Sequence, residues 1–512
     1  MITFIVSLVA LVLGYLLYGA VVERVVRPDD RETPAVRLAD GVDYVALPTW
    51  KVFMIQFLNI AGTGPIFGAI MGMWFGPASY LWIVLGCVFA GAVHDFMSGM
   101  LSLRNDGANL PALIGKYLGN GTRYVMLVFT VFLLIMVGAV FVYSPALILA
   151  SMWGKPIVWI IVIFAYYVVA TLLPIDKIIG RVYPLFAIAL LVMAAGLLVG
   201  LLIKMPQLPE LWDLNNMSQW TGAQIVDGKD TMGITSYLQK NPLFPCLFIT
   251  IACGAISGFH ATQSPLMARC LKSERLARPI FYGAMITEGI VALIWATVSS
   301  YFFYYGGWRE VVSPEVVNDF MAQVQLADGK TLIQYFTAPQ VVNLVCSAWL
   351  GIFGGTLAIL GVVAAPITSG DTAFRSARLI IAEWLHFEQK SMARRLIISV
   401  PLFVVSLLLL IWQMENPDGF NVLWQYFGWI NQALSVFTLW MITVYLARNH
   451  KAYIITLIPA VFMTVVCFSF LVASPQALGQ QQLTPWAVLA VIFVAVTWFA
   501  LWLKKDRALK PE

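Results

Sequence analysis

The stretches IAGTGP at residues 60–65 and CGAISGFH at residues 253–260 interrupt two hydrophobic segments near their middles. Glycine loosens a helix, and proline cannot donate a backbone hydrogen bond, so both stretches predict local unwinding. Five hydrophobic segments separate the starts of the two interrupted segments, which should therefore cross a bilayer in opposite directions. A pair of oppositely directed broken helices indicates the binding site of a secondary transporter.

The composition predicts an all-α polytopic membrane protein. Of the 512 residues, 60% are hydrophobic and only 11% are charged, and the mean hydropathy is +0.84. Repeated apolar runs of about 20 residues match the length that a helix needs to cross a bilayer core. We expect one membrane domain, residues 1–512, with thirteen spans, at about 2–22, 51–72, 79–103, 124–150, 156–174, 183–203, 243–263, 280–304, 339–367, 396–412, 421–446, 453–473 and 485–503.

The placement of basic residues predicts the orientation of the chain. If the N-terminus faces outward, the inner loops of the thirteen-span arrangement hold 25 of the 31 lysines and arginines. Cytoplasmic loops carry an excess of such residues, so the sequence favours an outer N-terminus and a cytoplasmic C-terminus. Two long outer loops, near 204–242 and 305–338, are expected to hold short surface helices.

The spacing of the breaks suggests two five-helix repeats of inverted topology, an arrangement seen in APC/LeuT-like transporters. Repeat one would cover about 51–203 and repeat two about 243–446, each beginning with its broken helix. Helices at about 2–22 and 453–503 would be accessory. In this arrangement the substrate binds near the bilayer midplane, between the repeats.

The first break offers backbone groups for binding, at Gly62, Thr63, Gly64 and Pro65. Unwound backbone inside a membrane is tolerated where protein or a hydrated cavity satisfies it. The N-terminus of the half-helix after Pro65 carries partial positive charge and suits a carboxylate. The alternative is a kinked packing helix whose small residues allow close helix contacts.

The second break adds polar side chains, and we assign Ser257, Gly258, His260 and Gln263 to the substrate site. A histidine beside an unwound segment suits proton coupling or anion binding, because its charge changes near neutral pH. The alternative is a histidine that forms a structural hydrogen bond between helices.

Acidic residues inside predicted spans are candidates for ion coupling. Asp95, preceded by His94, lies in the third span, and Glu288 lies at a similar depth in the eighth. Either carboxyl could carry a coupling proton, as could His260; the order of preference is Asp95, His260, Glu288. The alternative for both acids is a structural role, and for Asp95 this would be pairing with the nearby basic loop.

A third polar cluster closes the predicted ninth span and contains Thr368, Ser369 and Asp371. Hydroxyl and carboxylate oxygens opposite the carbonyls of a broken helix would form an oxygen-rich cation site. Alternatively, Asp371 pairs with Arg375 one helical turn later, on a cytoplasmic connector.

The sequence contains no enzyme signature and predicts no resident cofactor or metal. It lacks a His-Glu-x-x-His helix, a phosphate-cradling loop ending in Gly-Lys and a glycine-flanked serine elbow. The six cysteines are scattered without zinc or disulfide spacing and are interpreted as small apolar helix residues.

Several motifs resemble the carbon starvation protein A family of bacterial inner-membrane transporters. They are IAGTGPI at 60–66, GAVHDF at 91–96, RNDG at 104–107, FITIACGAISGFHA at 248–261 and the Thr/Asp/Arg segment at 368–378. The resemblance implies the five-plus-five inverted fold, location in the inner membrane and uptake of small nutrients driven by a cation gradient. Peptides and pyruvate are the substrates proposed for the family.

The chain also departs from the family pattern near the presumed substrate site. Ile55 and Gln56 stand where the family usually has histidines, Ala69 replaces a frequent second proline, and 262–265 reads TQSP instead of a serine-rich stretch. Long family members also have additional C-terminal membrane helices. Substrate identity therefore does not follow from the resemblance.

Together these features predict a symporter that imports a small carboxylated nutrient, such as pyruvate or a short peptide, driven by H+ or alternatively Na+. Two other classes remain: a passive channel, and a membrane sensor or enzyme with His94, Asp95 and His260 as metal ligands. The expected partners are the small-molecule substrate and membrane lipid, not nucleic acid. The sequence does not indicate an oligomeric state.

Overall fold

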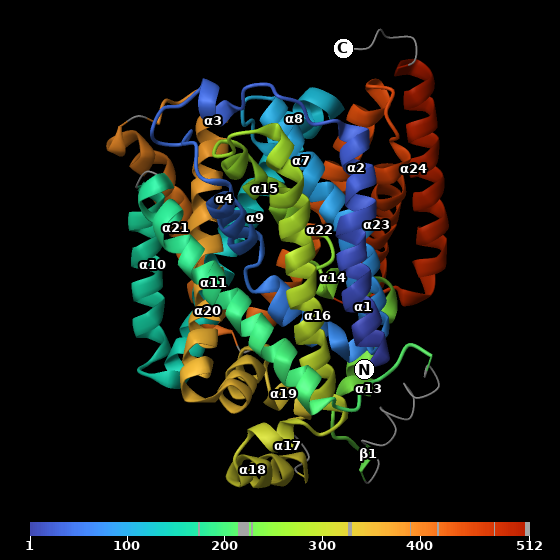
Figure 1. Ribbon diagram of the computed structural model, residues 1–512. Coiled ribbons are helices and arrows are strands. Elements are labelled where there is room, and N and C mark those ends of the chain that lie inside the picture. The colour runs from blue at the N-terminus through green and yellow to red at the C-terminus, as the bar shows by residue number, and fades with distance from the viewer. Residues whose placement is uncertain are drawn as a thin grey trace.

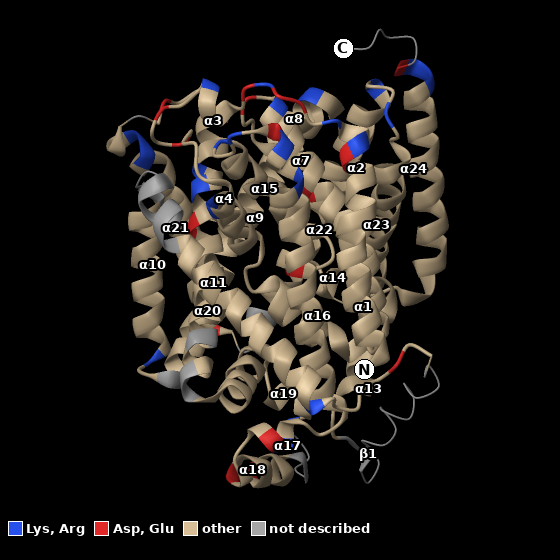
Figure 2. Ribbon diagram, in the orientation of Figure 1, with Lys and Arg blue, Asp and Glu red and all other residues tan. Residues whose placement is uncertain are grey.

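Long apolar helices that run between two ends of the molecule form most of the structure (Figure 1). The computed structural model describes residues 1–512 except 173–174, 213–224, 227–228, 326–329, 390, 417–418, 476 and 507–512. Met1 lies at one end of the helical bundle, and α24, which finishes at Asp506, reaches the opposite end (Figure 1). Lysine and arginine gather at the end reached by α24 (Figure 2).

Up to Lys204, the described part of the chain contains eleven α-helices. Three π-helical turns, at Gly14–Tyr18, Gly64–Gly68 and Cys87–Gly91, and a 3-10 turn at Met73–Phe75 interrupt its spans. The helices are α1 (Ile2–Leu13), α2 (Gly19–Val26), α3 (Pro34–Arg37), α4 (Thr49–Ile60), α5 (Ala69–Gly72), α6 (Ala78–Gly86), α7 (Ala92–Arg104), α8 (Leu110–Leu118), α9 (Asn120–Met152), α10 (Pro156–Leu172) and α11 (Ile175–Lys204).

The second half begins with a small hairpin in which β1 (Ile225–Val226) pairs antiparallel with β2 (Lys229–Asp230), Ile225 opposite Asp230. A π-helical turn at Arg278–Tyr282 precedes α16, and 3-10 turns lie at Glu274–Leu276 and Gln481–Leu483. The helices are α13 (Ile234–Lys240), α14 (Leu243–Thr250), α15 (Gly258–Ala268), α16 (Gly283–Tyr304), α17 (Trp308–Val311), α18 (Pro314–Gln325), α19 (Leu332–Tyr335), α20 (Ala338–Trp384), α21 (Met392–Glu415), α22 (Gly419–Arg448), α23 (Ile454–Ala473) and α24 (Thr484–Asp506).

Within the described residues, ten helices are long and apolar enough to span a membrane, or eleven if the bent pair Thr49–Ile60 and Gly64–Phe75 is one span. The predicted span at 156–174 corresponds to a shorter apolar helix, α10, and the one at 243–263 to the two short helices α14 and α15. The polytopic helical class is therefore confirmed, whereas the count of thirteen and the inverted repeat stay predictions. The predicted repeats, 51–203 and 243–446, correspond approximately to α4–α11 and α14–α22.

The predicted boundaries of the ninth span, 339–367, are wrong. α20 continues to Trp384, Gly351 within it has a φ of +66°, and the apolar span runs from Gly354 to Trp384. Residues 368–371 therefore lie within a span instead of closing it. Polar residues in this helix suggested a cytoplasmic connector, but they are buried against protein, where a membrane helix tolerates them.

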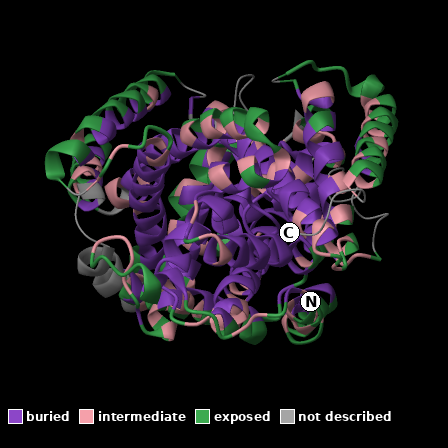
Figure 3. Cartoon of the chain, turned by 90° about the horizontal axis from the view of Figure 1, so that it is seen from above, coloured by how far each residue is buried: buried purple, intermediate pink, exposed green. Residues whose placement is uncertain are grey.

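Burial separates the central helices from the peripheral ones (Figure 3). The apolar windows of Gly354–Trp384 and Glu274–Tyr304 are 88% and 83% buried, whereas those of Ile2–Val26 and Gln481–Asp506 are 28% and 11% buried. The N-terminal helix and α24 thus present apolar side chains outward, and both lie in the segments predicted to be accessory. The short helices expected in the outer loops are α13 and α17–α19, while 213–224 lies outside the described residues.

Candidate functional site

The first break separates α4 from the helical turns that follow it. α4 ends at Ile60, residues 61–63 leave the helical path, and the π-helical turn Gly64–Gly68 restarts the segment. The two halves are bent by 54°. Pro65 stands in the first turn of the second half, where a missing backbone N–H costs least. The glycine and proline positions therefore set where this segment unwinds.

The second break lies between α14, which ends at Thr250, and α15, which begins at Gly258. Gly254 has a φ of +91°, a left-handed conformation that favours glycine. Ser257, directly before α15, is extended, with φ −142° and ψ 123°. The backbone at both predicted interruptions is therefore non-helical.

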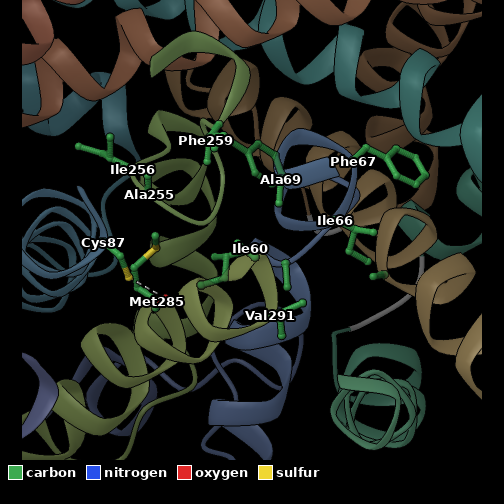
Figure 4. Packing of buried hydrophobic residues seen from close by; sticks show 14 of the residues in the cluster. Ile60, Ile66, Phe67, Ala69, Cys87, Ala255, Ile256, Phe259, Met285 and Val291 are labelled. Atoms are coloured by element: carbon green, nitrogen blue, oxygen red, sulfur yellow. Dashed lines mark hydrogen bonds between the residues drawn. The ribbon is translucent and has the colours of Figure 1, made fainter. Parts of the chain in front are cut away.

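The two breaks pack directly against each other. A Cβ added at Gly64 would overlap the Cβ and Sγ of Cys253, and one added at Gly68 would lie 2.8 Å from the carbonyl oxygen of Thr250. Apolar side chains from the break regions, among them Ile60, Ile66 and Ile256, belong to one buried hydrophobic cluster (Figure 4). Small residues in the first segment thus allow the unwound backbone of the second to approach closely.

Acidic and histidine side chains from three spans meet beside the second break. His260 of α15 places its Nδ1 2.8 Å from Asp95 Oδ2, and His94 places its Nδ1 2.8 Å from Asp95 Oδ1. The Nε2 of His260 lies 3.4 Å from Glu288 Oε2 of α16. All four side chains are fully buried. Asp95, His260 and Glu288, predicted from separate segments, therefore form one cluster.

The geometry of this cluster suits a proton held between His260 and Glu288. If His260 is neutral and donates its Nδ1–H to Asp95, its Nε2 is an acceptor facing Glu288. Two acceptors at 3.4 Å repel each other, so their approach is favourable when His260 or Glu288 is protonated. Both carboxyl oxygens of Glu288 lack a hydrogen-bond partner among the described residues. The cluster can therefore hold or release a proton at this contact.

Serines extend the cluster along the same two helices. Ser98 Oγ of α7 and Ser264 Oγ of α15 are 3.2 Å apart, and Ser264 Oγ donates to the His260 carbonyl at 3.1 Å. Gln263 donates through Nε2 to Thr262 Oγ1 at 2.8 Å, and its Oε1 has no partner among the described residues. Polar contacts thus hold α7 and α15 together beside the unwound backbone.

The α20 residues predicted for ion coupling contact two different helices, α4 and α11. Ser369 Oγ hydrogen-bonds the carbonyls of Leu58 and Asn59 at 3.3 and 2.9 Å, next to the first break. Asp371 accepts a hydrogen bond from Tyr183 of α11, whose hydroxyl also donates to the Thr368 carbonyl at 3.3 Å. The structure thus brings Ser369 to the break but directs the Asp371 carboxylate toward α11.

All eight residues predicted to bind substrate are buried. Four lie at the first break (Gly62, Thr63, Gly64, Pro65), and four lie in or directly before α15 (Ser257, Gly258, His260, Gln263). These eight residues are therefore enclosed by protein in this conformation.

Sequence reasoning missed Asn431 of α22, which holds the start of α15. Its Oδ1 accepts the backbone N–H of Phe259 at 2.7 Å and the hydroxyl of Ser257 at 3.0 Å. An N-cap side chain normally comes from the residue before the helix. The available signal was the polar pair Asn431–Gln432 inside a hydrophobic segment, since polar groups in membrane helices connect neighbouring helices.

Replacing Asn431 by alanine should destabilise the protein measurably. The variant leaves a buried N–H and a buried hydroxyl without their acceptor, which costs about 1–3 kcal/mol per unsatisfied group. We expect a lower unfolding temperature in detergent and weaker ligand-induced stabilisation. Asn416→Ala is the control, because Asn416 is exposed and its side-chain amide donates to the Trp412 carbonyl at the end of α21. Equal unfolding temperatures for both variants would contradict this role.

Two further polar side chains near the first break, Gln56 and Asn59, were not assigned from the sequence. The amides of Gln56 and Asn59 and the hydroxyl of Thr63 are buried and lack a partner among the described residues; only Thr63 had been selected, for its backbone. Buried polar groups are normally hydrogen-bonded, so exceptions call for an explanation such as a ligand. Gln56 and Asn59 lie on α4, within a turn or two of the break.

Cys253 also has a more specific position than the sequence indicated. Its thiol lies 3.5 Å from Ser257 Oγ, and its Sγ, a nitrogen of His260 and an oxygen of Glu288 lie within 4.8 Å of one another. The sequence suggested His94, Asp95 and His260 as the alternative metal ligands. The group that converges in the described residues shares only His260 with that set.

The fold is shared with solved membrane transporters. A manganese transporter of Eremococcus coleocola aligns over 92% of this chain and 98% of its own, with a TM-score of 0.54 and 12% identity. A Na+-coupled sialic acid symporter aligns over 95% and 97%, with a TM-score of 0.52 and 14% identity. At such low identities the likeness concerns the fold alone.

Sequence relatives agree with the family predicted from the motifs. An uncharacterized membrane protein of Haemophilus influenzae is 42% identical over 59% of this chain and 91% of its own length. The Escherichia coli peptide transporter CstA is 25% identical over 86% and 76%, and the Escherichia coli pyruvate/proton symporter BtsT is 31% identical over 55% and 46%. The family model for carbon starvation protein CstA matches residues 1–154 and 142–470. The chain is therefore a transmembrane transporter, not an enzyme, and belongs to the carbon starvation protein CstA family.

Proposed function

We propose that this protein is a symporter that imports a small carboxylated nutrient, such as pyruvate or a short peptide. Relatives named as a peptide transporter and as a pyruvate/proton symporter support this substrate class. The N-terminal end of the half-helix at Gly64–Pro65 and the unpaired amides of Gln56 and Asn59 offer N–H donors to a carboxylate. Ser257, His260 and Gln263 border the same region from the second segment.

The observation that carries this proposal is the buried contact among Asp95, His260 and Glu288. Three spans contribute to it, and His260 belongs to the half-helix that begins at the second break. Movement of α15 relative to α7 or α16 would lengthen these contacts and change where the proton is most stable. Proton binding and helix movement are therefore linked, which is the requirement for coupling.

Sodium is the alternative coupling ion. Ser369 and the carbonyls of Leu58 and Asn59 supply oxygen ligands between α20 and the first break, and Thr368 lies next to them in the helix. Oxygen ligands of this kind suit a hard cation, and a Na+-coupled symporter shares the fold. The proton is favoured because the acid–histidine cluster lies at the second break, whereas Asp371 is directed toward α11.

We place the protein in the bacterial inner membrane with its N-terminus outside and its C-terminus in the cytoplasm. The positively charged end of the bundle in Figure 2, which α24 reaches, would face the cytoplasm. The outward-facing apolar side chains of α1 and α24 would contact lipid. Alternating access would come from movement of one inverted repeat, 51–203 or 243–446, against the other.

Uptake by proteoliposomes tests the function. With pyruvate or dipeptides outside and a more acidic exterior, we expect the internal substrate concentration to exceed the external one. A gradient of one pH unit supplies about 1.4 kcal/mol per proton. If one proton enters with each substrate in an electroneutral cycle, this gradient supports an internal concentration about tenfold above the external one. Dissipating the gradient with a protonophore is the control. Equilibration without accumulation under any H+ or Na+ gradient would indicate a passive channel. Stoichiometric bound metal without uptake would indicate the metal-binding class, for which Cys253, His260 and Glu288 are placed closest.

A further inference from the structure

A cavity lies away from the breaks, at the end of the molecule where basic residues gather (Figure 2). Its volume is about 480 Å³, and it lies among the C-terminal ends of α2, α7 and α22 and the helix α8. Six basic residues line it: Arg27, Arg31, Arg104, Lys116, Arg448 and Lys451. Among the residues that line it, Asp29 is the one carboxylate.

Three of these cations are paired with carboxylates. Arg31 forms a two-point contact with Asp29, and Arg448 Nε lies 3.4 Å from Asp506 Oδ1. Arg104 bonds both oxygens of Glu274, at 2.6 and 3.1 Å, and also the Tyr445 hydroxyl at 3.1 Å. These three cations are therefore held in place, and their charge is largely balanced.

The other three cations have no carboxylate partner among the described residues. Lys451 donates to the Val26 carbonyl at 2.7 Å, and Lys116 donates to the Asn105 side-chain oxygen at 3.0 Å. Arg27 has a left-handed φ of +57°, at the end of α2, and is exposed. Neutral oxygens do not cancel charge, so Arg27, Lys116 and Lys451 leave the cavity strongly positive.

The positive charge of the cavity also affects the pKa of Lys451. Burial lowers the pKa of this lysine below its usual value, and the neighbouring charges of Arg104 and Arg27 lower it further. An anion bound in the cavity would offset the contribution of these neighbouring cations. Positive charges crowded into a concave site are stable when a multivalent anion neutralises several of them together.

We propose that this cavity binds a phosphate-bearing anion at the cytoplasmic face. Guanidinium and ammonium groups that converge from several elements suit the several oxygens of a phosphate, and the volume is in the range of small-ligand pockets. The site also borders peripheral helices, since Arg448 contacts Asp506 of α24 and lies over the Trp502 ring. The anion can thus be an anionic phospholipid headgroup or a soluble phosphate compound.

An anion bound in this cavity would connect α2, at the end of the N-terminal helix, to the central helices α7 and α22. α2 would be tied to α7, which carries Asp95, and to α22, which carries Asn431. Phosphate binding would therefore stabilise the arrangement of helices around the acid–histidine cluster. The binding itself does not depend on the identity of the transported substrate.

Binding assays on the purified full-length protein test this proposal in two arms. The soluble arm measures pyrophosphate affinity by calorimetry. The lipid arm counts phosphatidylglycerol molecules retained by the protein in native mass spectrometry. The double variant Arg27→Glu/Lys116→Glu should weaken binding by about tenfold or more in at least one arm, because it removes two charge-assisted contacts. Lys51→Glu/Lys272→Glu is the charge-matched control, since neither residue lines the cavity.

The outcomes separate the two ligand sources. Loss of pyrophosphate affinity alone identifies a soluble phosphate, and loss of retained phosphatidylglycerol alone identifies a lipid headgroup. Equal binding by the double variant and its control in both arms overturns the proposal. If the charge reversal prevents folding, Arg27→Gln/Lys116→Gln gives the same comparison with a smaller perturbation.

Discussion

Asp95→Asn is expected to abolish uphill uptake in proteoliposomes under an imposed pH gradient. Asparagine keeps the size of the side chain but cannot ionise, and it offers one acceptor oxygen where the Asp95 carboxylate places two, each 2.8 Å from a histidine Nδ1. Where the wild type should accumulate substrate about tenfold for each pH unit, the variant should stop at about equal concentrations. The measured quantity is the ratio of internal to external labelled substrate.

Substrate exchange separates coupling from binding. If Asp95 acts in proton coupling, exchange of labelled for unlabelled substrate at equal pH on both sides should persist in Asp95→Asn. His260→Ala should impair both exchange and accumulation, because His260 also belongs to the proposed substrate site. Glu288→Gln should reduce accumulation less than Asp95→Asn, because Glu288 lies 3.4 Å from His260, farther than the 2.8 Å between His260 and Asp95.

Glu315→Gln is the matched control for these variants, since Glu315 is an exposed acid of α18. Unchanged accumulation by Asp95→Asn and His260→Ala would show that the coupling residues lie elsewhere. The next candidates would then be Ser369 and Thr368 beside the first break. In that case, a sodium gradient should drive uptake, and Ser369→Ala should remove the dependence.

The two breaks could be predicted because their causes are local. Gly62, Gly64 and Pro65 loosen the first segment whatever surrounds them, and Gly254 can adopt a positive φ that other residues disfavour. Membrane spans are also locally encoded, because the backbone N–H and C=O groups of an apolar segment in the bilayer must be hydrogen-bonded within a helix. These features depend on residues close together in the sequence, so one sequence is enough to find them.

The cluster at His260 could be predicted only as a set of separate candidates. Asp95, His260 and Glu288 are far apart in the chain, and their contact depends on how α7, α15 and α16 pack. The role of Asn431 likewise needs α22 to lie against the start of α15. The end of α20 was misplaced because polar residues at 368–371 look like a helix end when the surrounding protein is unknown.

Gly64→Ala should greatly reduce uptake, and Cys253→Gly should restore it. The added methyl group would overlap the Cβ and Sγ of Cys253, where the two unwound segments meet. Overpacking of this kind costs about 1–3 kcal/mol, and here it would separate the segments that form the site. We expect uptake to fall by about tenfold or more and the unfolding temperature to decrease. Backbone strain does not explain such a loss, because Gly64 is not among the positive-φ residues.

The double variant makes this prediction specific to the contact between the breaks. In Gly64→Ala/Cys253→Gly the two overlapping atoms are gone, and the nearest remaining atom of residue 253, its Cα, lies 3.7 Å from the new methyl, an ordinary contact distance. Uptake should therefore recover well above that of the single variant, although Cys253→Gly alone removes packing. Gly121→Ala is the control, since nothing lies within 4 Å of a Cβ there. A double variant no more active than Gly64→Ala would mean that the segments do not meet as described, and the proposed substrate site between them would be lost with that contact.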